Sequence, residues 1–336
     1  MRLSLALGAA LGLALALALC GYYGFAEIAS GLGAAGWGVL AVIAFHPVQM
    51  LFSSLAWQVL LPPSRAPRLL TFIALRWIRE AVNNLLPVAQ IGGEFVGARL
   101  LRQGGVPLGA GGASVTVDLT MEMLSQIIFT LLGLALLVPG LHEPRIAPWI
   151  IGGIGLAVVI VAAFISAQRF GLFHLVERGL IRLAERGSAW SSLGEIAGLH
   201  RSIRALYASP RRLVWACSYH LISWLLGGVE VMLALHLVGA SVDLREGLII
   251  ESLGQALRAV GFAIPASLGV QEGGYVLVCG LLGISPQAAI ELSLLKRIRE
   301  VALGVPALFV WQLIEARRLV DRVADDVSVP AAADGD

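Results

Sequence analysis

Two short stretches of the chain place a carboxylate beside a proline–glycine break in an otherwise apolar sequence. Glu94 follows Pro87 by seven residues, and Glu272 follows Pro265 by the same interval. Helix ends exposed at such breaks present free N–H groups to anions and free C=O groups to cations. Both stretches are therefore candidates for binding a charged group or carrying a coupling proton. The alternative is that each glutamate only caps a helix.

Arginines lie close to both breaks, and arginine binds phosphate through charge-assisted, often bidentate hydrogen bonds. Glu122 and Glu300 lie in apolar segments and are the expected partners of Arg79, Arg258 and Arg299, because an unpaired charge inside a membrane is costly. The alternative is that these pairs only hold the protein together. The candidate residues for substrate binding or transport are Arg76, Arg79, Asn83, Asn84, Glu94, Arg99, Glu122, Arg258, Glu272, Arg299 and Glu300.

Other ionisable residues are weaker candidates. Asp118 lies one turn before Glu122, and Lys296 and Arg297 precede the last apolar segment. Lys296 and Arg297 can equally sit at a membrane interface and extend their charged ends to water. The histidines inside apolar segments are interpreted as packed, hydrogen-bonded side chains rather than proton relays; they are His46, His220 and His236.

The sequence predicts no cofactor and no metal. Its six histidines and three cysteines show no paired ligand spacing. It also contains no Gly-x-x-x-x-Gly-Lys-Ser/Thr run, the loop that cradles nucleotide phosphates.

The elements that position these residues must be membrane helices. Hydrophobic residues make up 58% of the 336 positions and charged residues 14%, whereas soluble domains carry charge at about a quarter of their positions. Backbone exposed to lipid must satisfy its own hydrogen bonds, so the sequence predicts an all-α polytopic membrane protein. A net charge of +2 gives no reason to expect a nucleic-acid partner. Six spanning helices are predicted at 3–25, 36–61, 113–138, 146–166, 213–238 and 298–316.

Two further apolar stretches, 69–105 and 246–290, are broken by Pro, Gly and charges and are predicted to be re-entrant. The loop 167–212 carries eight arginines against three glutamates, which places it in the cytoplasm of a bacterial cell by the positive-inside rule. The C-terminus is then cytoplasmic too. The first re-entrant stretch enters from the cytoplasm and the second from outside.

An internal repeat relates the two stretches. A shift of 178 residues superimposes the two proline–glutamate pairs, and it also maps Trp37 to Trp215 and Glu122 to Glu300. An odd number of crossings separates the halves, so the repeat is inverted, as in many transporters. One membrane domain is predicted over 1–322, before a disordered tail at 323–336. Its parts are a first helix at 1–33, repeat one at 34–140, a linking helix and basic loop at 141–211, and repeat two at 212–318.

The motifs resemble a known family. The runs 83–87, 92–94 with Arg99, and 265–274 are similar to the transmembrane region of lysylphosphatidylglycerol synthases, a flippase-like family. The second motif, continuing to Tyr275, is most similar to the hopanoid-biosynthesis-associated, HpnL-like branch. The resemblance covers nearly the whole chain. It departs from many relatives at the turn after Pro265, where they carry a glycine-rich sequence.

The resemblance implies a lipid-translocating membrane domain. The synthases carry a soluble aminoacyl transferase as well; none is seen here, so lipid aminoacylation is not expected. We expect an inner-membrane transporter of a polar or anionic lipid, such as a hopanoid or phospholipid, with Glu94 and Glu272 as gate or coupling groups. The alternatives are a membrane-embedded enzyme acting on lipid headgroups and a non-catalytic scaffold for lipid-biosynthesis enzymes. The expected partners are the bilayer, its lipids and, on the last reading, those enzymes.

Overall fold

The computed structural model describes most of the predicted membrane domain. The described residues are 35–64, 66–86, 92–138, 199–261 and 269–328, with the single residues 33, 152, 155, 159, 166 and 267. Every regular element within these residues is a helix, which confirms the all-α prediction. The predicted helix at 3–25, nearly all of that at 146–166 and most of the basic loop lie outside the described residues.

Three long apolar helices have the length needed to cross a bilayer. They are α3 (Val39–Leu60, preceded by the short 3-10 helix η1, Gly36–Gly38), α6 (Leu108–Leu137) and α11 (Pro210–Leu237). They correspond to the predicted helices at 36–61, 113–138 and 213–238. A short amphipathic helix, α10 (Leu199–Tyr207), precedes α11 and packs on α6.

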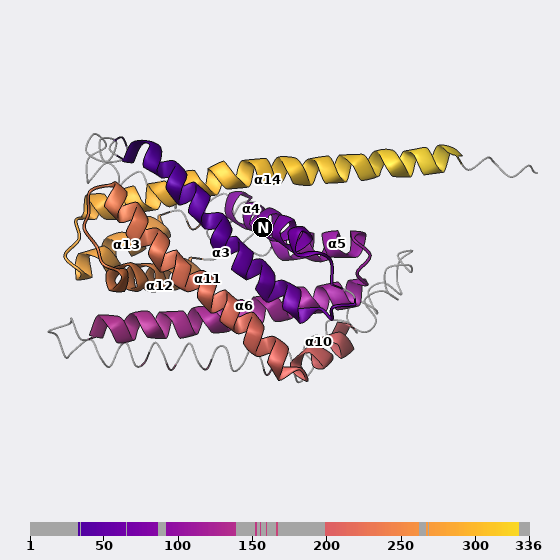
Figure 1. Ribbon diagram of the computed structural model, residues 1–336, viewed down its shortest axis with the longest axis horizontal. Coiled ribbons are helices and arrows are strands. Elements are labelled where there is room, and N and C mark those ends of the chain that lie inside the picture. Colours follow the sequence, from indigo (N-terminus) through magenta and orange to yellow (C-terminus); the bar gives the residue numbers. More distant parts are fainter. Residues whose placement is uncertain are drawn as a thin grey trace, which may run out of the picture.

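The two broken stretches form helical hairpins. Helices α4 (Leu69–Leu85) and α5 (Gly92–Gln103) make the first, and α12 (Leu244–Val260) and α13 (Val270–Leu281) the second. The first hairpin is closed near its tip by Asn83, whose Oδ1 accepts a hydrogen bond from the Gly93 N–H at 2.8 Å. Figure 1 shows α5 and α13 at opposite ends of the molecule.

The inverted repeat is visible in the helix bounds. Adding 178 to Gly92–Gln103 gives 270–281, the bounds of α13, and adding it to Leu108 gives the first residue of α14 (Pro286–Ser328). Helices α3 and α11 are antiparallel, because Gly38 approaches Leu237 at one end of the pair while Ser53, later in α3, approaches Ser223, earlier in α11. Helices α6 and α14 also run in opposite directions (Figure 1). Each broken stretch therefore forms a hairpin, and the inverted arrangement is present.

Helix α14 differs from the prediction at both ends. It begins at Pro286 instead of 298 and continues through Ser328, so residues 323–328 are helical where a disordered tail was predicted; residues 329–336 lie outside the described part. Lys296 consequently sits well inside the helix, with 2% of its surface exposed. Extension of Lys296 to a membrane interface is therefore the wrong interpretation.

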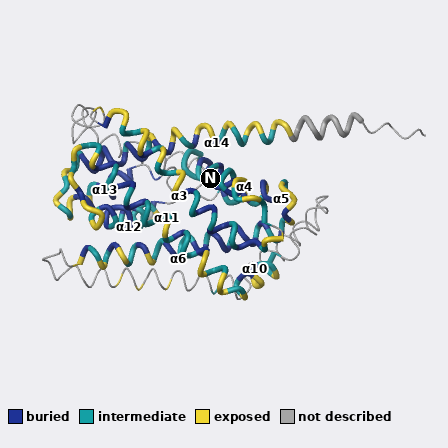
Figure 2. The backbone as a smooth tube through the Cα atoms, viewed as in Figure 1, coloured by how far each residue is buried: buried dark blue, intermediate teal, exposed yellow. Residues whose placement is uncertain are grey.

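Each hairpin packs in its own apolar cluster. The first cluster holds Trp57, Phe72, Ile78, Leu101 and their neighbours, and the second Val231, Ile250, Tyr275, Leu292 and theirs. Buried residues gather where the hairpins meet the long helices, whereas the far stretch of α14 alternates between intermediate and exposed residues (Figure 2). Because each hairpin buries its apolar face in a separate cluster, the polar residues of both hairpins lie between the two halves.

Candidate functional site

A polar cavity of about 280 Å³ lies between the two halves. Helices α3, α4, α5, α6, α11, α12 and α14 all contribute to its wall. Nine of the eleven candidate residues line it: Arg76, Arg79, Asn83, Asn84, Glu94, Glu122, Arg258, Arg299 and Glu300. The structure thus brings most of the candidates to one cavity from positions more than 200 residues apart in the sequence.

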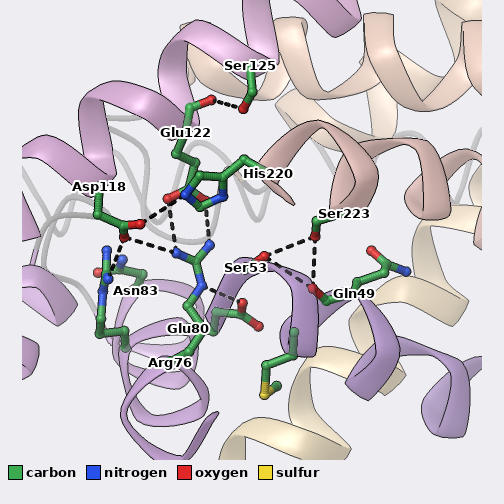
Figure 3. A network of polar contacts seen from close by, with 12 residues as sticks. Gln49, Ser53, Arg76, Glu80, Asn83, Asp118, Glu122, Ser125, His220 and Ser223 are labelled. Atoms are coloured by element: carbon green, nitrogen blue, oxygen red, sulfur yellow. Dashed lines mark hydrogen bonds and ion pairs between the residues drawn. The ribbon is translucent and has the colours of Figure 1, made fainter. Parts of the chain in front are cut away.

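Arg76 is the centre of the first half of the site. Its Nε donates to Glu80 Oε1 at 3.0 Å, and its two terminal nitrogens bind the two oxygens of Glu122. Asp118 Oδ2 lies 3.7 Å from Arg76 Nη1. Figure 3 shows the guanidinium reaching from α4 between Glu80 and the carboxylates of α6. The spacing of Arg76 and Glu80, one helical turn, puts both on the face of α4 that borders the cavity.

Arg79 lies one turn further along α4 and is almost fully buried. It donates to Glu94 Oε2 at 3.1 Å and to Asp118 Oδ2 at 2.8 Å, and its guanidinium stacks 4.5 Å from the Trp57 ring. The return helix α5 can approach because Gly97 has no side chain; a Cβ there would lie 2.8 Å from Arg79 Cδ. Arg79 therefore ties Glu94 and α5 to the cavity wall.

The second half of the site is built around Arg258 and Glu300. Arg258 Nη1 donates to Glu300 Oε1 at 2.8 Å, and Arg297 Nη1 donates to Glu300 Oε2 at 3.2 Å. Arg258 Nη2 also donates to Asn84 Oδ1 at 3.0 Å. Asn84 and Arg258 lie near the tips of the two hairpins, so this bond joins the halves where the hairpins meet.

Glu230 is a charged residue that sequence reasoning missed. It is fully buried within α11 and binds Arg299, and it accepts a hydrogen bond from Gln49 Nε2 at 2.5 Å. His46 lies between it and the first half, with Nδ1 3.5 Å from Glu230 Oε2 and Nε2 3.1 Å from Glu80 Oε2. A carboxylate inside the predicted helix 213–238 was the signal for Glu230, since such groups rarely occur without a function or partner.

Lys296 forms a buried ion pair with Glu251, a cavity residue that sequence reasoning also missed. The Tyr275 hydroxyl donates to the same carboxylate at 3.4 Å. Lys296 occupies the position in repeat two that corresponds to Asp118 in repeat one. The two halves thus share a backbone plan and carry opposite charges at this position.

Two candidates stand apart from the cavity. Glu272 is buried behind it, accepts a hydrogen bond from the Gly269 N–H at 2.7 Å and lies 3.4 Å from Arg297 Nε. Its carboxylate caps α13, as the structural alternative proposed. The Arg99 side chain is 63% exposed and pairs with Glu315 at 2.8 Å. The structure does not bring Arg99 to the other candidates, because it projects from the outer face of α5.

The capping role of Glu272 predicts a graded response. We expect Glu272→Ala to lower the free energy of unfolding in detergent by about 1 kcal/mol, the typical effect of losing a cap. Glu272→Gln keeps an oxygen that accepts the hydrogen bond from the Gly269 N–H, so its free energy of unfolding should fall by less. Denaturant unfolding followed by tryptophan fluorescence measures both. If both variants lose the same free energy of unfolding, the negative charge of Glu272 near Arg297 contributes more to stability than the helix cap does.

Within the described residues, Asp118, Glu122 and His220 form a cluster whose donor atoms could hold a metal ion, all within 4.8 Å of one another. These donors are engaged elsewhere. Both oxygens of Glu122 bind Arg76, one oxygen of Asp118 binds Arg79, and the other is 2.9 Å from His220 Nε2. The positive charges of the Arg76 and Arg79 guanidinium groups at the same carboxylates repel a metal cation. The geometry therefore favours an ion-pair network over a metal site.

Comparison with known proteins bears on the same arrangement. The family model for the lysylphosphatidylglycerol synthase TM region matches residues 5–307, a range that includes both hairpins and the cavity. No curated protein and no solved structure gave a significant match. The match supports the predicted family and does not reach the predicted hopanoid-associated branch. The chain therefore belongs to the lysylphosphatidylglycerol synthase TM region family of multi-pass membrane proteins, whose function is connected with membrane lipids.

Proposed function

We propose that this protein moves a polar or anionic lipid between the leaflets of a bacterial inner membrane, with the lipid headgroup passing through the central cavity. The observation that carries the proposal is the pair of inverted re-entrant hairpins whose ends meet at Asn84 and Arg258 on a charged cavity. Inverted repeats with broken helices at a central site are the architecture of many transporters.

The size and polarity of the cavity suit a headgroup. Pockets for whole drug-sized ligands measure about 300–1,000 Å³, and this cavity, at about 280 Å³, lies just below that range. The acyl chains would remain in the surrounding lipid. Ionisable groups within a membrane commonly mark a substrate pathway.

Two arginines are suited to hold a phosphate-bearing headgroup. Arg299 lines the cavity, and its Nε has no hydrogen-bond partner in the part of the chain that the structure describes. Arg258 stands at the hairpin end, where its bond to Asn84 can be exchanged for one to a ligand. A phosphate oxygen accepts charge-assisted hydrogen bonds from both groups. Rocking of the halves, which opens this contact to one side at a time, gives alternating access.

The test is lipid movement in vesicles that contain the purified full chain and fluorescent phosphatidylglycerol or phosphatidylethanolamine. We expect the wild type to move at least one probe and Arg258→Gln and Arg299→Gln to slow it about tenfold or more, because a hydrogen bond to a charged group contributes about 1.5–3 kcal/mol. Arg99→Gln is the matched control and should move lipid at the wild-type rate. Folded wild-type protein that moves no probe contradicts the proposal.

One contact favours an enzyme as the second candidate. Asp118 Oδ1 lies 2.9 Å from His220 Nε2, the kind of carboxylate contact that orients an imidazole as a general base. Mass analysis of the lipids recovered from the same vesicles separates the two functions. A chemically altered lipid that depends on His220 would support the enzyme, and unaltered lipid in the opposite leaflet supports transport.

A further inference from the structure

Apart from the balanced pair of Glu251 and Lys296, the ion pairs in and beside the cavity form two groups, one in each half of the molecule. Within the described residues, the first consists of Glu80, Glu94, Asp118, Glu122, Arg76 and Arg79, and the second of Glu230, Glu272, Glu300, Arg258, Arg297 and Arg299. The second group has equal numbers of carboxylates and arginines. The first has four carboxylates against two arginines, an excess of two negative charges.

Two histidines lie against this excess. His220 Nε2 is 2.9 Å from Asp118 Oδ1, and His46 Nε2 is 3.1 Å from Glu80 Oε2. Uncompensated charge is unfavourable in a buried site. A proton bound to His46 reduces the excess of the first group to one negative charge.

His46 differs from His220 because both of its ring nitrogens face carboxylates. Nε2 faces Glu80 of the first group and Nδ1 faces Glu230 of the second, at 3.1 and 3.5 Å. A neutral imidazole has a donor on only one nitrogen, whereas the imidazolium has donors on both. Within the described part of the chain, His46 is the ionisable residue whose contacts connect the two groups. A proton on His46 therefore links the halves.

The residue is also placed where helix α3 can bend. Pro47 follows it inside the helix, and because proline has no N–H the carbonyl of Ile43 lacks its usual helical partner. Each helix packed against α3 brings charge to the cavity around His46. These groups are Arg76 and Glu80 on α4, Asp118 and Glu122 on α6, Glu230 and His220 on α11, and Arg299 and Glu300 on α14.

We propose that His46 is a proton-binding site that couples lipid movement to a proton gradient, an inference that rests on the proposed transport function. With the proton bound, the imidazolium bridges Glu80 and Glu230 and holds the halves in the arrangement seen here. The proton then passes from the ring to cavity water as hydronium and leaves. The neutral ring has a donor for at most one of these two carboxylates, and the halves are free to rock. His46 binds the proton from one side of the membrane and releases it to the other side, so that each cycle moves one proton.

The coupling is tested in vesicles of phosphatidylethanolamine and phosphatidylglycerol that contain the full chain and fluorescent phosphatidylglycerol, with the membrane potential clamped. For one proton per lipid, a difference of about one pH unit should sustain about a tenfold ratio of probe between leaflets. His46→Gln should leave the ratio at one. His236→Gln is the control, because His236 is exposed and contacts the backbone of its own helix; it should behave as the wild type.

A second measurement tests the site whether or not lipid moves. Nitrogen NMR of histidine-labelled wild-type protein, assigned by the signal missing from His46→Gln, should show His46 doubly protonated at neutral pH and singly protonated in alkaline solution. A singly protonated His46 at neutral pH overturns the proposal. Titration of His46 without movement of any probe refutes the transport function and leaves the proton site standing. Movement with a ratio of one under the gradient refutes the coupling alone, and a ratio abolished by His220→Gln but retained in His46→Gln refutes the assignment to His46.

Discussion

Replacing Glu230 with alanine is expected to lower the free energy of unfolding by about 3–5 kcal/mol, the range measured when one member of a buried ion pair is removed. Glu230 is fully buried, and its partner Arg299 is 6% exposed. Without the carboxylate, the guanidinium stays buried and keeps only a longer ion pair, 3.8 Å from Glu300, among the described residues. Gln49 also loses the acceptor for its amide. Denaturant unfolding of the purified chain in detergent measures the change.

Two further variants separate the loss of charge from the loss of shape. Glu230→Gln keeps an acceptor for Arg299 and should fall between the wild type and Glu230→Ala. Arg99→Ala breaks the ion pair with Glu315, in which the Arg99 side chain is 63% exposed. This change should lower the free energy of unfolding by at most about 1 kcal/mol, because exposed ion pairs contribute little. A loss for Glu230→Ala no larger than that for Arg99→Ala would show that Arg299 finds another partner or water.

The architecture was largely predictable because its signals are local or periodic. Long apolar runs give the spans, and a break by proline and glycine gives each hairpin. The matching residue types predict a repeat with a shift of 178 residues. The same shift applied to the bounds of α5 and the start of α6 gives the bounds of α13 and the start of α14. These features depend on composition and spacing along the chain, so they need no knowledge of contacts.

The start of α14 could not be predicted in the same way. Glu291, Lys296 and Arg297 interrupt the apolar run, and a charged interruption looks like the end of a membrane segment. In the folded chain Lys296 is neutralised by Glu251, 45 positions earlier in the sequence. The helix therefore continues through residues whose charges are paired by a distant element, a tertiary effect that local pattern does not contain.

The pairing of the site residues shows the same limit. The sequence identified Glu122 and Glu300 as partners for arginines, and Glu300 does bind Arg258 and lies near Arg299. It did not indicate that Glu122 would bind Arg76 instead of Arg79. Arg76 and Arg79 lie one turn apart on the same face of α4, so the sequence does not distinguish them as partners for Glu122. The packing of the neighbouring helices decides which carboxylate each arginine reaches.

The pair of Arg76 and Glu122 allows a structural role to be separated from a role in transport. Arg76→Ala should lower the free energy of unfolding by about 3–5 kcal/mol, because it leaves Glu122, Glu80 and Asp118 without their shared cation. Glu122→Ala should lower it less, since Arg76 keeps the other two carboxylates. In the double variant the loss should be smaller than the sum of the single losses by about 0.5–3 kcal/mol, the usual coupling between contacting residues.

Lipid movement should not follow stability in this series. If the guanidinium of Arg76 contacts the headgroup, movement stays below about a tenth of the wild-type rate in the double variant, even where stability recovers. Arg76→Lys sharpens the comparison, because lysine keeps the charge and cannot bind Glu122 with two parallel hydrogen bonds. Recovery of movement together with stability in Arg76→Ala/Glu122→Ala would assign this pair to holding the bundle together. The headgroup contacts would then be made by Arg258 and Arg299, which also line the cavity.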